Sequence, residues 1–505
     1  MGMEWITDWT RELRYTPYAD WPEGYQESLR KSQAASDWRA AYHIQPAGGL
    51  LNDPNGFSYF NGQWQLFYQY YPYGPVHGLK SWYQMTSDNL VDWQDQGLAL
   101  QPDTPYDSHG VYSGSALPVG DKLFLMYTGN VRDVDGDRET YQMGAWLAQD
   151  GQIEKIDQVL IHQPQGYTAD FRDPQIFRRA GQYWICIGAQ TVNREGRVLM
   201  YKSDDLLNWE MAGELDLGQA DLGYMVECPN LVFIDDQPVL IFCPQGLDQE
   251  TAAYANIYPN MYIVGRAFDW DKLAFVDPSP MQLVDQGFDL YASQAIQAPD
   301  GRVLAVSWLG LPDMPAVTAE EGWAHSLSLV KELTLVDGRL YQRPVDELHV
   351  LRQDSSDFSL DLAEGRQSLP SLCAGQEEIQ IHLAPGSKGR LELFAAADAE
   401  GAVVLAFDLE AGQLTLEQTA AGVRMASDYG YQRALDLPAG QALNLTLYLD
   451  HSLLEIFVNG GEETLTTPVY PRSKEAGQTY IQGSGQVSGQ VWALRAMEES
   501  VTKVD

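Results

Sequence analysis

A turn followed by a short apolar strand occurs five times in the first two thirds of the chain. The copies begin at residues 61, 120, 180, 235 and 299, so that successive starts are 59, 60, 55 and 64 residues apart. A second element also repeats, as SDNLVDWQ (87–94) and SDDLLNWE (203–210). A β-sandwich would repeat hairpin signals, but spacing and wording that repeat together are typical of propeller blades. Five copies therefore predict a five-bladed β-propeller.

The composition changes after the propeller pattern ends. Thirteen of the fourteen tryptophans precede residue 345, and alternating apolar strands separated by Gly and Asp turns follow it, which is typical of a two-sheet sandwich. The predicted fold is therefore all-β, a five-bladed β-propeller followed by a C-terminal β-sandwich. The expected bounds are 1–35 for a partly helical N-terminal extension, 36–345 for the propeller, 346–357 for a polar linker and 358–505 for the sandwich.

The charge balance excludes several classes of partner. The chain has 32 basic and 70 acidic residues, a formal net charge of −38, so nucleic acid and anionic membranes are unsuitable partners. No apolar run approaches the ~20 residues of a membrane span, and the first residues are polar, so we expect a cytoplasmic protein. The four cysteines lack metal-ligand spacing, which favours free thiols and no zinc site.

Three acidic motifs are candidates for chemistry. Asp53 lies in the tight turn Asn-Asp-Pro-Asn-Gly at 52–56. Asp173 follows Arg172, which we expect to keep the Asp173 carboxylate ionised. Glu227 has mostly apolar sequence neighbours, a setting that suits a proton donor. Each motif alone is common turn punctuation, but the three belong to different blades and can meet on one axis, where glycoside cleavage needs paired carboxyl groups.

Longer blocks around these acids carry a resemblance to a known family. They match in order, and a further block lies in the second domain, so the resemblance covers roughly residues 40–475. The chain resembles glycoside hydrolase family 32, which comprises invertases, fructanases and sucrose-6-phosphate hydrolases and has the same two-domain architecture. The blocks are HIQPAGGLLNDPNGFSYFNGQWQLFYQYYP (43–72), GVYSGSA (110–116), FRDPQIF (171–177), MVECPNL (225–231), FDLYASQ (288–294) and DHSLLEIFVNGGEETLTTPVYP (450–471).

The resemblance implies a retaining exo-β-fructofuranosidase that needs no metal or organic cofactor. Asp53 would be the nucleophile at the anomeric carbon of a fructosyl group, Glu227 the proton donor and later the base, and Asp173 a group that binds fructose hydroxyls. The rest of the implied substrate site consists of Asn52, Gln69, Trp82, Tyr112, Ser113, Arg172 and Tyr291. A core position between blades is the competing reading for Trp82.

The sequence also departs from the family pattern at several positions. The specificity for the leaving group therefore cannot be transferred from the family. The changes are Leu50 for tryptophan, Tyr71 for asparagine, Tyr83 and Gln84 for Gly-His, His325 for glycine, and Val330-Lys331 for Pro-Arg.

Sucrose or sucrose 6-phosphate is the leading substrate. The alternatives are short fructo-oligosaccharides such as 1-kestose, with some fructosyl transfer, and a sugar-binding propeller without catalysis. A phosphorylated sugar would need a local basic pocket within a chain of charge −38, for which Lys80 and Lys331 are weak candidates. The sandwich would offer edge strands for pairing two copies, so a homodimer is allowed while the oligomeric state stays open.

Overall fold

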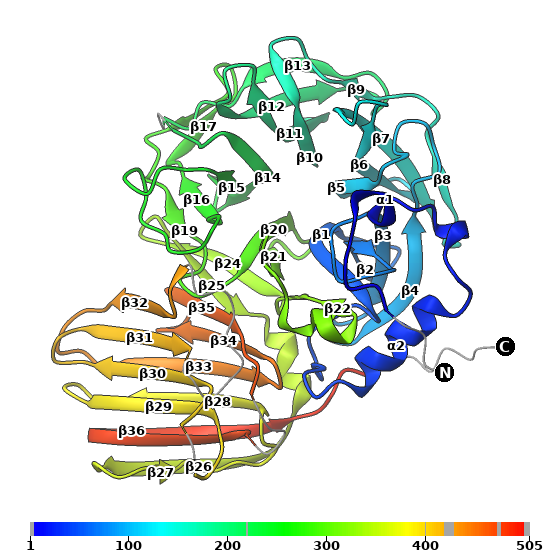
Figure 1. Cartoon of the computed structure of the whole chain (residues 1–505). Coiled ribbons are helices and arrows are strands. Elements are labelled where there is room, and N and C mark those ends of the chain that lie inside the picture. Colours follow the sequence, from blue (N-terminus) through cyan, green and yellow to red (C-terminus); the bar gives the residue numbers. More distant parts are fainter. Residues whose placement is uncertain (1–4, 219–220, 399, 419–428, 472–475, 499–505) are drawn as a thin grey trace.

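A computed structural model describes residues 5–218, 221–398, 400–418, 429–471 and 476–498. Figure 1 shows a ring of five small sheets, blue to light green, with a second body of yellow to red strands beside the fifth blade. The predicted five-bladed β-propeller and C-terminal β-sandwich are confirmed. Among the described residues, no helix is long and apolar enough to cross a membrane.

Each blade is an antiparallel sheet whose first strand lies nearest the axis of the ring (Figure 1). The first blade contains β1 (Gly49–Phe60), β2 (Gln63–Tyr71), β3 (Ser81–Ser87) and β4 (Trp93–Leu100), and the second β5 (Val111–Val119), β6 (Lys122–Arg132), β7 (Arg138–Ala148), β8 (Ile153–Lys155) and β9 (Ile161–His162). The third contains β10 (Tyr167–Arg179), β11 (Gln182–Thr191), β12 (Gly196–Ser203) and β13 (Glu210–Glu214).

The fourth and fifth blades complete the ring. The fourth contains β14 (Met225–Ile234), β15 (Gln237–Gln245), β16 (Met261–Val264) and β19 (Gln282–Leu283), with the separate hairpin β17 (Ala267–Asp269) and β18 (Ala274–Val276) nearby in sequence. The fifth contains β20 (Leu290–Gln297), β21 (Val303–Leu309), β23 (Ser326–Leu327), β24 (Lys331–Val336) and β25 (Arg339–Pro344).

A short parallel pairing joins the last blade to the first. β22 (Trp323–Ala324) pairs with β1 at Gly49 and Leu50, so that the chain after β21 returns to the first strand. Gly49 has φ +74°, and a Cβ built there would lie 2.1 Å from the Tyr71 carbonyl oxygen. Only glycine fits this closure, because other residues would need both the positive φ and the space.

The register shifts by a β-bulge in the innermost strand of every blade. The shifts lie between Leu51 and Pro54 in β1, Val111 and Gly114 in β5, Arg172 and Gln175 in β10, Glu227 and Asn230 in β14, and Tyr291 and Gln294 in β20. A bulge leaves residues unpaired and re-aims their side chains. The five bulges therefore turn side chains from five blades toward the axis.

The sandwich is organised around one long strand. The first part of β36 (Gln478–Leu494) pairs with β29, and its second part pairs with β28 and β26, so β36 passes from one sheet to the other. Between the two sheets lies a leucine-rich core. The other strands are β26 (Arg352–Leu362), β27 (Gln367–Ser368), β28 (Gln376–Leu383), β29 (Lys388–Ala395), β30 (Val403–Asp408), β31 (Gln413–Gln418), β32 (Gln432–Asp436), β33 (Leu443–Asp450), β34 (Leu453–Val458) and β35 (Glu463–Pro468).

The segment 346–357, expected to be a polar linker, has regular structure instead. It consists of the 3₁₀ helix η3 (Asp346–Leu351) and the first residues of β26. Leu348 and Leu351 are buried in the hydrophobic core on the propeller side, while His349 and Val350 between them are exposed. The sequence of this segment predicts a linker because most of its residues are polar, and the burial of its two leucines is not apparent from the sequence.

A buried ionic cluster joins the two domains. The carboxylate of Asp450 accepts hydrogen bonds from the backbone N–H groups of Ala41, Tyr42 and His43. The His43 ring lies between Asp450, 2.8 Å away, and Glu455, 3.2 Å away. The segment that leads into β1 of the propeller is thereby fixed to the sandwich.

The N-terminal extension lies across the first blade. It contains α1 (Arg11–Arg14), η1 (Tyr18–Asp20) and α2 (Tyr25–Ala35). The Tyr18 hydroxyl donates a hydrogen bond to the Leu79 carbonyl oxygen at 2.6 Å, and the Trp21 ring stacks on Tyr73 with centroids 4.5 Å apart. The extension packs on Leu50 and Tyr71 in one apolar cluster, which gives these two departures from the family pattern a structural role.

Candidate active site

A cavity of about 950 Å³ opens on the axis of the propeller. Asp53, Asp173 and Glu227 all line it, each from the innermost strand of a different blade. Three of the bulges described above place these carboxyl groups, so residues more than 50 positions apart in the chain meet in one cavity.

The Asp53 carboxylate is held by several donors. Its Oδ1 accepts a hydrogen bond from the Asn52 amide at 3.1 Å, and its Oδ2 accepts from the Ser113 hydroxyl at 2.5 Å and from the Gln69 amide at 3.2 Å. Burial raises the pKa of Asp53 and the negative charge of Glu227 adds to this, while the bonds from Ser113 and Asn52 oppose the rise. The donors fix the orientation of a half-buried carboxyl group that lines the cavity.

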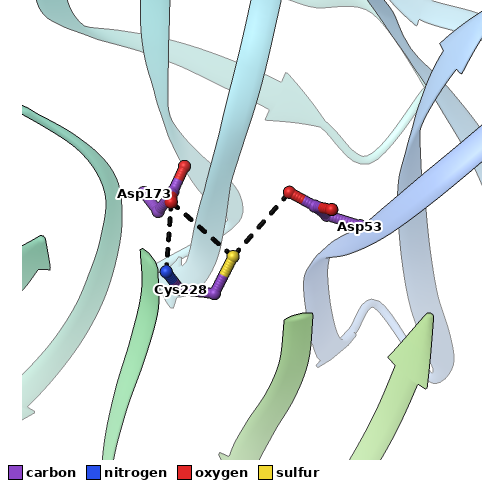
Figure 2. Close-up of side chains that lie close together, drawn as sticks. All are labelled: Asp53, Asp173 and Cys228. Carbon is purple, nitrogen blue, oxygen red and sulfur yellow. Dashed lines mark hydrogen bonds between the residues drawn. The ribbon is translucent and has the colours of Figure 1, made fainter. Parts of the chain in front are cut away.

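Asp173 lies beside Cys228 at the base of the site. Figure 2 shows the Cys228 backbone N–H directed at Asp173 and the thiol between the two aspartates. The N···Oδ2 distance is 3.0 Å, and Sγ lies 3.6 Å from Asp173 and 3.7 Å from Asp53. Asp173 and Cys228 have φ values of +68° and +47°, unusual for residues other than glycine. The bulges accept this strain to direct the two groups inward.

The expected pairing of Arg172 with Asp173 differs in the structure. The Arg172 guanidinium instead bonds Glu227 at 2.7 Å and Asp170 at 2.7 Å, because the bulge between Arg172 and Gln175 turns the two neighbouring side chains apart. Burial raises the pKa of Asp173 to about 7, although the positive charge of Arg172 acts to lower it.

Glu227 has a polar environment in place of the expected apolar one. Its Oε1 accepts two hydrogen bonds from Arg172, at 2.7 and 3.1 Å, and its Oε2 accepts one from the Tyr291 hydroxyl at 2.7 Å. Its apolar sequence neighbours are buried: Val226 belongs to the core cluster of the third and fourth blades, and Met225 is also buried. Sequence neighbours on a strand therefore did not predict what the carboxyl group contacts.

The remaining residues expected in the substrate site fall into two groups. Asn52, Gln69 and Tyr112 line the cavity, and the Gln69 amide also donates to the Ser113 hydroxyl. Trp82 lies behind the wall: its side chain is fully buried and its indole N–H donates to the Tyr112 carbonyl oxygen at 2.9 Å. Packing between blades positions Tyr112 through Trp82, which leaves no Trp82 face for a sugar.

Lys80, a weak candidate for binding a phosphate, lies next to Asp53, the expected nucleophile. Its ammonium donates a hydrogen bond to the Asn52 side-chain oxygen, and only 2% of Lys80 is exposed. Burial lowers the pKa of Lys80 to about 7, although the negative charge of Asp53 acts to raise it. His77 and His325 also line the cavity. Burial lowers the pKa of His325 to about 4, so this imidazole is neutral at pH 7.

Asp53, Asp173 and Cys228 also present three ligand-type atoms within 4.8 Å of one another. A thiol binds a metal as thiolate, and burial raises the pKa of Cys228 well above its ordinary range, with the charges of both aspartates adding to it. The Asp53 and Asp173 oxygens near Sγ already accept hydrogen bonds from protein donors. These contacts favour a hydrogen-bonded acid cluster over a metal centre.

The fold and the site together define a class. Three acids meet in the axial cavity of a propeller that is followed by a sandwich. One is a carboxylate held by neutral donors, the second is bonded to an arginine and a tyrosine, and the third is buried. Paired carboxyl groups in a cavity that can hold a sugar are typical of the active site of a glycoside hydrolase.

Comparison with known proteins agrees. The sequence profile of the glycosyl hydrolases family 32 N-terminal domain matches residues 43–344, and that of the family 32 C-terminal domain matches 347–493. The chain belongs to glycosyl hydrolase family 32, as its motifs predicted, and is a glycoside hydrolase of the β-fructofuranosidase type.

Several relatives span nearly the whole chain. A sucrose-6-phosphate hydrolase of Pediococcus pentosaceus is 47% identical and covers 97% of this chain and 98% of its own. The structure of sucrose-6-phosphate hydrolase from Lactobacillus gasseri has a TM-score of 0.93 at 41% identity, covering 97% of this chain and 100% of its own. A mutant of a Bombyx mori family 32 β-fructofuranosidase, in complex with sucrose, has a TM-score of 0.82 at 31% identity, covering 94% and 97%.

Proposed function

We propose that the protein is a retaining exo-β-fructofuranosidase that hydrolyses the terminal fructosyl bond of sucrose or sucrose 6-phosphate. The observation that carries this is the pair of contrasting carboxyl groups, Asp53 among neutral donors and Glu227 bonded to Arg172 and Tyr291. The names of the Pediococcus and Lactobacillus relatives and the sucrose complex of the Bombyx enzyme support the substrate class.

In the first step Asp53 attacks the anomeric carbon of the fructosyl group. Its three hydrogen bonds, one to Oδ1 and two to Oδ2, hold the carboxylate in place, so that little reorganisation is needed when the C–O bond forms. Glu227, protonated, gives its proton to the oxygen of the leaving sugar as the glycosidic bond breaks. The product of this step is a fructosyl–Asp53 ester and a free sugar.

In the second step Glu227, now a carboxylate, takes a proton from water. The oxygen of that water attacks the anomeric carbon and the bond to Asp53 breaks, so the Asp53 carboxylate and protonated Glu227 are restored. Arg172 and Tyr291 orient Glu227 through both of its oxygens during the exchange. Asp173, buried beside Asp53, would accept hydrogen bonds from the fructose hydroxyls.

The cytoplasm is the compartment that this proposal favours. A sugar phosphate is charged and does not cross a lipid bilayer unaided, so its hydrolase must work where the phosphate is made. Free cysteines, three of them buried, fit a reducing compartment.

Product stereochemistry tests the retaining scheme. Early in the reaction, NMR should show β-fructose from sucrose, because two inversions at one carbon retain its configuration. Initial α-fructose would exclude the ester intermediate.

Replacement of the nucleophile tests the roles. Asp53→Asn should lower kcat on sucrose by at least 10²-fold, since a neutral amide cannot form the ester. Asp313→Asn is the matched control, because Asp313 lines the same cavity and its carboxylate accepts a bond from Tyr258 at 3.3 Å. Parent-like activity in Asp53→Asn would contradict the assignment, and circular dichroism would confirm that the variant is folded.

A further inference from the structure

The cavity differs in charge from the protein as a whole. The chain has a formal net charge of −38, yet the described side chains that line the cavity include six basic groups and four carboxylates. Three of those carboxylates are the acids of the proposed mechanism, and the fourth is Asp313. The basic groups are Arg11, Arg14, Lys80, Arg132, Arg138 and Arg172.

Two of these cations lie deep in the cavity and are engaged with the catalytic acids. Lys80 is bonded to Asn52 beside Asp53, and Arg172 is bonded to Glu227. Arg138 shares the carboxylate of Asp170 with Arg172, so its charge is partly compensated. Neither Lys80 nor Arg172 is available to a second anion without disturbing the reacting groups.

The other three arginines come together from distant parts of the sequence. Arg11 and Arg14 belong to α1 of the N-terminal extension, and Arg132 ends β6 of the second blade. Arg11 and Arg132 both donate to the carbonyl oxygen of Gly136, at 3.3 Å each. Figure 1 places α1 close to β3 and β5, in agreement with the backbone bond from Leu79 to Arg14.

Among the described residues, no ion pair joins Arg11, Arg14 or Arg132 to a carboxylate, although the chain has more than two acids for every base. The Nε atoms of Arg14 and Arg132 are buried and have no hydrogen-bond acceptor in the described structure. Unsatisfied buried donors are costly, which suggests that a ligand supplies the missing acceptor.

We propose that Arg11, Arg14 and Arg132 form a subsite for a phosphate group carried by the leaving sugar. The proposal rests on the function proposed above and names its preferred substrate, sucrose 6-phosphate with the phosphate on the glucosyl unit. With the fructosyl group against Asp53 and Asp173, the glucosyl group occupies another part of the same cavity, whose lining includes Arg11 and Arg14 of α1. Guanidinium groups suit phosphate because they donate two parallel hydrogen bonds.

The strongly negative surface does not oppose this subsite at short range. At physiological ionic strength the Debye length is about 8 Å, so most surface carboxylates are screened from a phosphate inside the cavity. Arg11, Arg14 and Arg132, in contrast, line the cavity themselves. Lys331, the other sequence candidate, is excluded because it is 2% exposed in its side chain and forms an ion pair with Glu455 at 2.9 Å, at the domain interface.

Steady-state kinetics with two substrates test the subsite. In Arg11→Gln, Arg14→Gln and Arg132→Gln, kcat/KM for sucrose 6-phosphate should fall at least tenfold, and kcat/KM for sucrose should change less than twofold. Added NaCl should reduce the parent's rate on the phosphorylated sugar more than its rate on sucrose. Sucrose hydrolysis by each variant reports that its fold and acids are intact.

Arg266→Gln is the matched control. Arg266 is exposed, pairs with Asp277 and does not line the cavity, so the variant loses the same unit of charge without touching the subsite. Equal falls on both sugars, or an equal fall in the control, would overturn the subsite. A parent enzyme that cleaves both sugars equally well would reject the subsite and leave the proposed function standing, whereas a parent that cleaves neither would reject both.

Discussion

At the scale of single residues, the site works by giving similar groups different surroundings. Asp53 accepts bonds from neutral amides and a hydroxyl, Glu227 from a cation and a phenol, and Asp173 from one backbone N–H and a thiol. Environments of this kind separate the roles of carboxyl groups that would be equivalent in water.

Asp173 should show a trade between stability and function. Burial raises its pKa to about 7, so the stability it contributes is fully present below about pH 4 and is lost as pH rises through 7. Asp173→Asn stays neutral at all pH values. Its melting temperature should exceed that of the parent at pH 8 and match it near pH 4, while kcat falls at least 10²-fold. A lower melting temperature than the parent at pH 8 would show that the ionised carboxylate stabilises the fold.

The Tyr291 hydroxyl should matter through one hydrogen bond. Tyr291→Phe removes the donor to Glu227, and the loss of a bond to a charged group is worth about 1.5–3 kcal/mol, or roughly 10- to 100-fold in kcat/KM. Tyr258→Phe is the comparison, because that ring lies 6.3 Å from Tyr291 and its hydroxyl bonds Asp313. Equal losses in the two variants would argue against a specific role for the Tyr291 bond.

At the scale of elements, the recurring bulge connects fold and function. A regular strand alternates its side chains between two faces, whereas each innermost strand here shifts register at the point where a site residue or its neighbour lies. β1 has a second register shift, between Asn55 and Ser58, and Gly56 within it has φ +56°.

Two glycines of the first blade separate backbone strain from packing. Gly62 has φ +80° with open space around its Cβ position, so Gly62→Ala should cost only the left-handed conformation, about 1–2 kcal/mol of unfolding free energy. A Cβ at Gly56 would lie 2.6 Å from the Phe67 ring, so Gly56→Ala should cost more and lower kcat by displacing Asp53. Urea unfolding and sucrose kinetics measure both. Equal effects would mean that the Phe67 contact yields freely.

At the scale of the whole molecule, the N-terminal extension packs on the first blade, and the sandwich binds the segment that precedes that blade. The extension brings α1 to the cavity and packs on Leu50 and Tyr71, and the sandwich fixes residues 41–43 through Asp450. The propeller thus supplies the three acids, while the sandwich positions the chain that enters the propeller and the extension adds residues to the lining of the cavity.

The domain interface should weaken at alkaline pH. Burial alone would lower the pKa of His43, but hydrogen bonds to Asp450 and Glu455 raise it to about 9. The stability from this charged histidine is therefore full below about pH 6.5 and is lost as pH rises through 9. Melting temperature measured between pH 6 and 9.5 should fall in the parent and fall less in His43→Gln, which starts lower. His382→Gln, exposed in the sandwich, should keep the parent's profile.

The repeat and the ordered motifs were enough to predict the five blades, the sandwich and the family, because strand alternation, turn residues and period are local properties of a chain. They also singled out Asp53, Asp173 and Glu227. The leucines that anchor the segment 346–357 were missed because its polar letters outnumber them.

Only the tertiary structure decided which side chains meet. It paired Arg172 with Glu227 in place of Asp173, moved Trp82 behind the cavity wall, put Lys80 beside Asp53 and brought Arg11 and Arg14 to Arg132. The physical reason is that bulges redirect side chains by one position, and a ring of blades joins residues separated by more than 100 positions. Neither effect leaves a signal in the local pattern of the sequence.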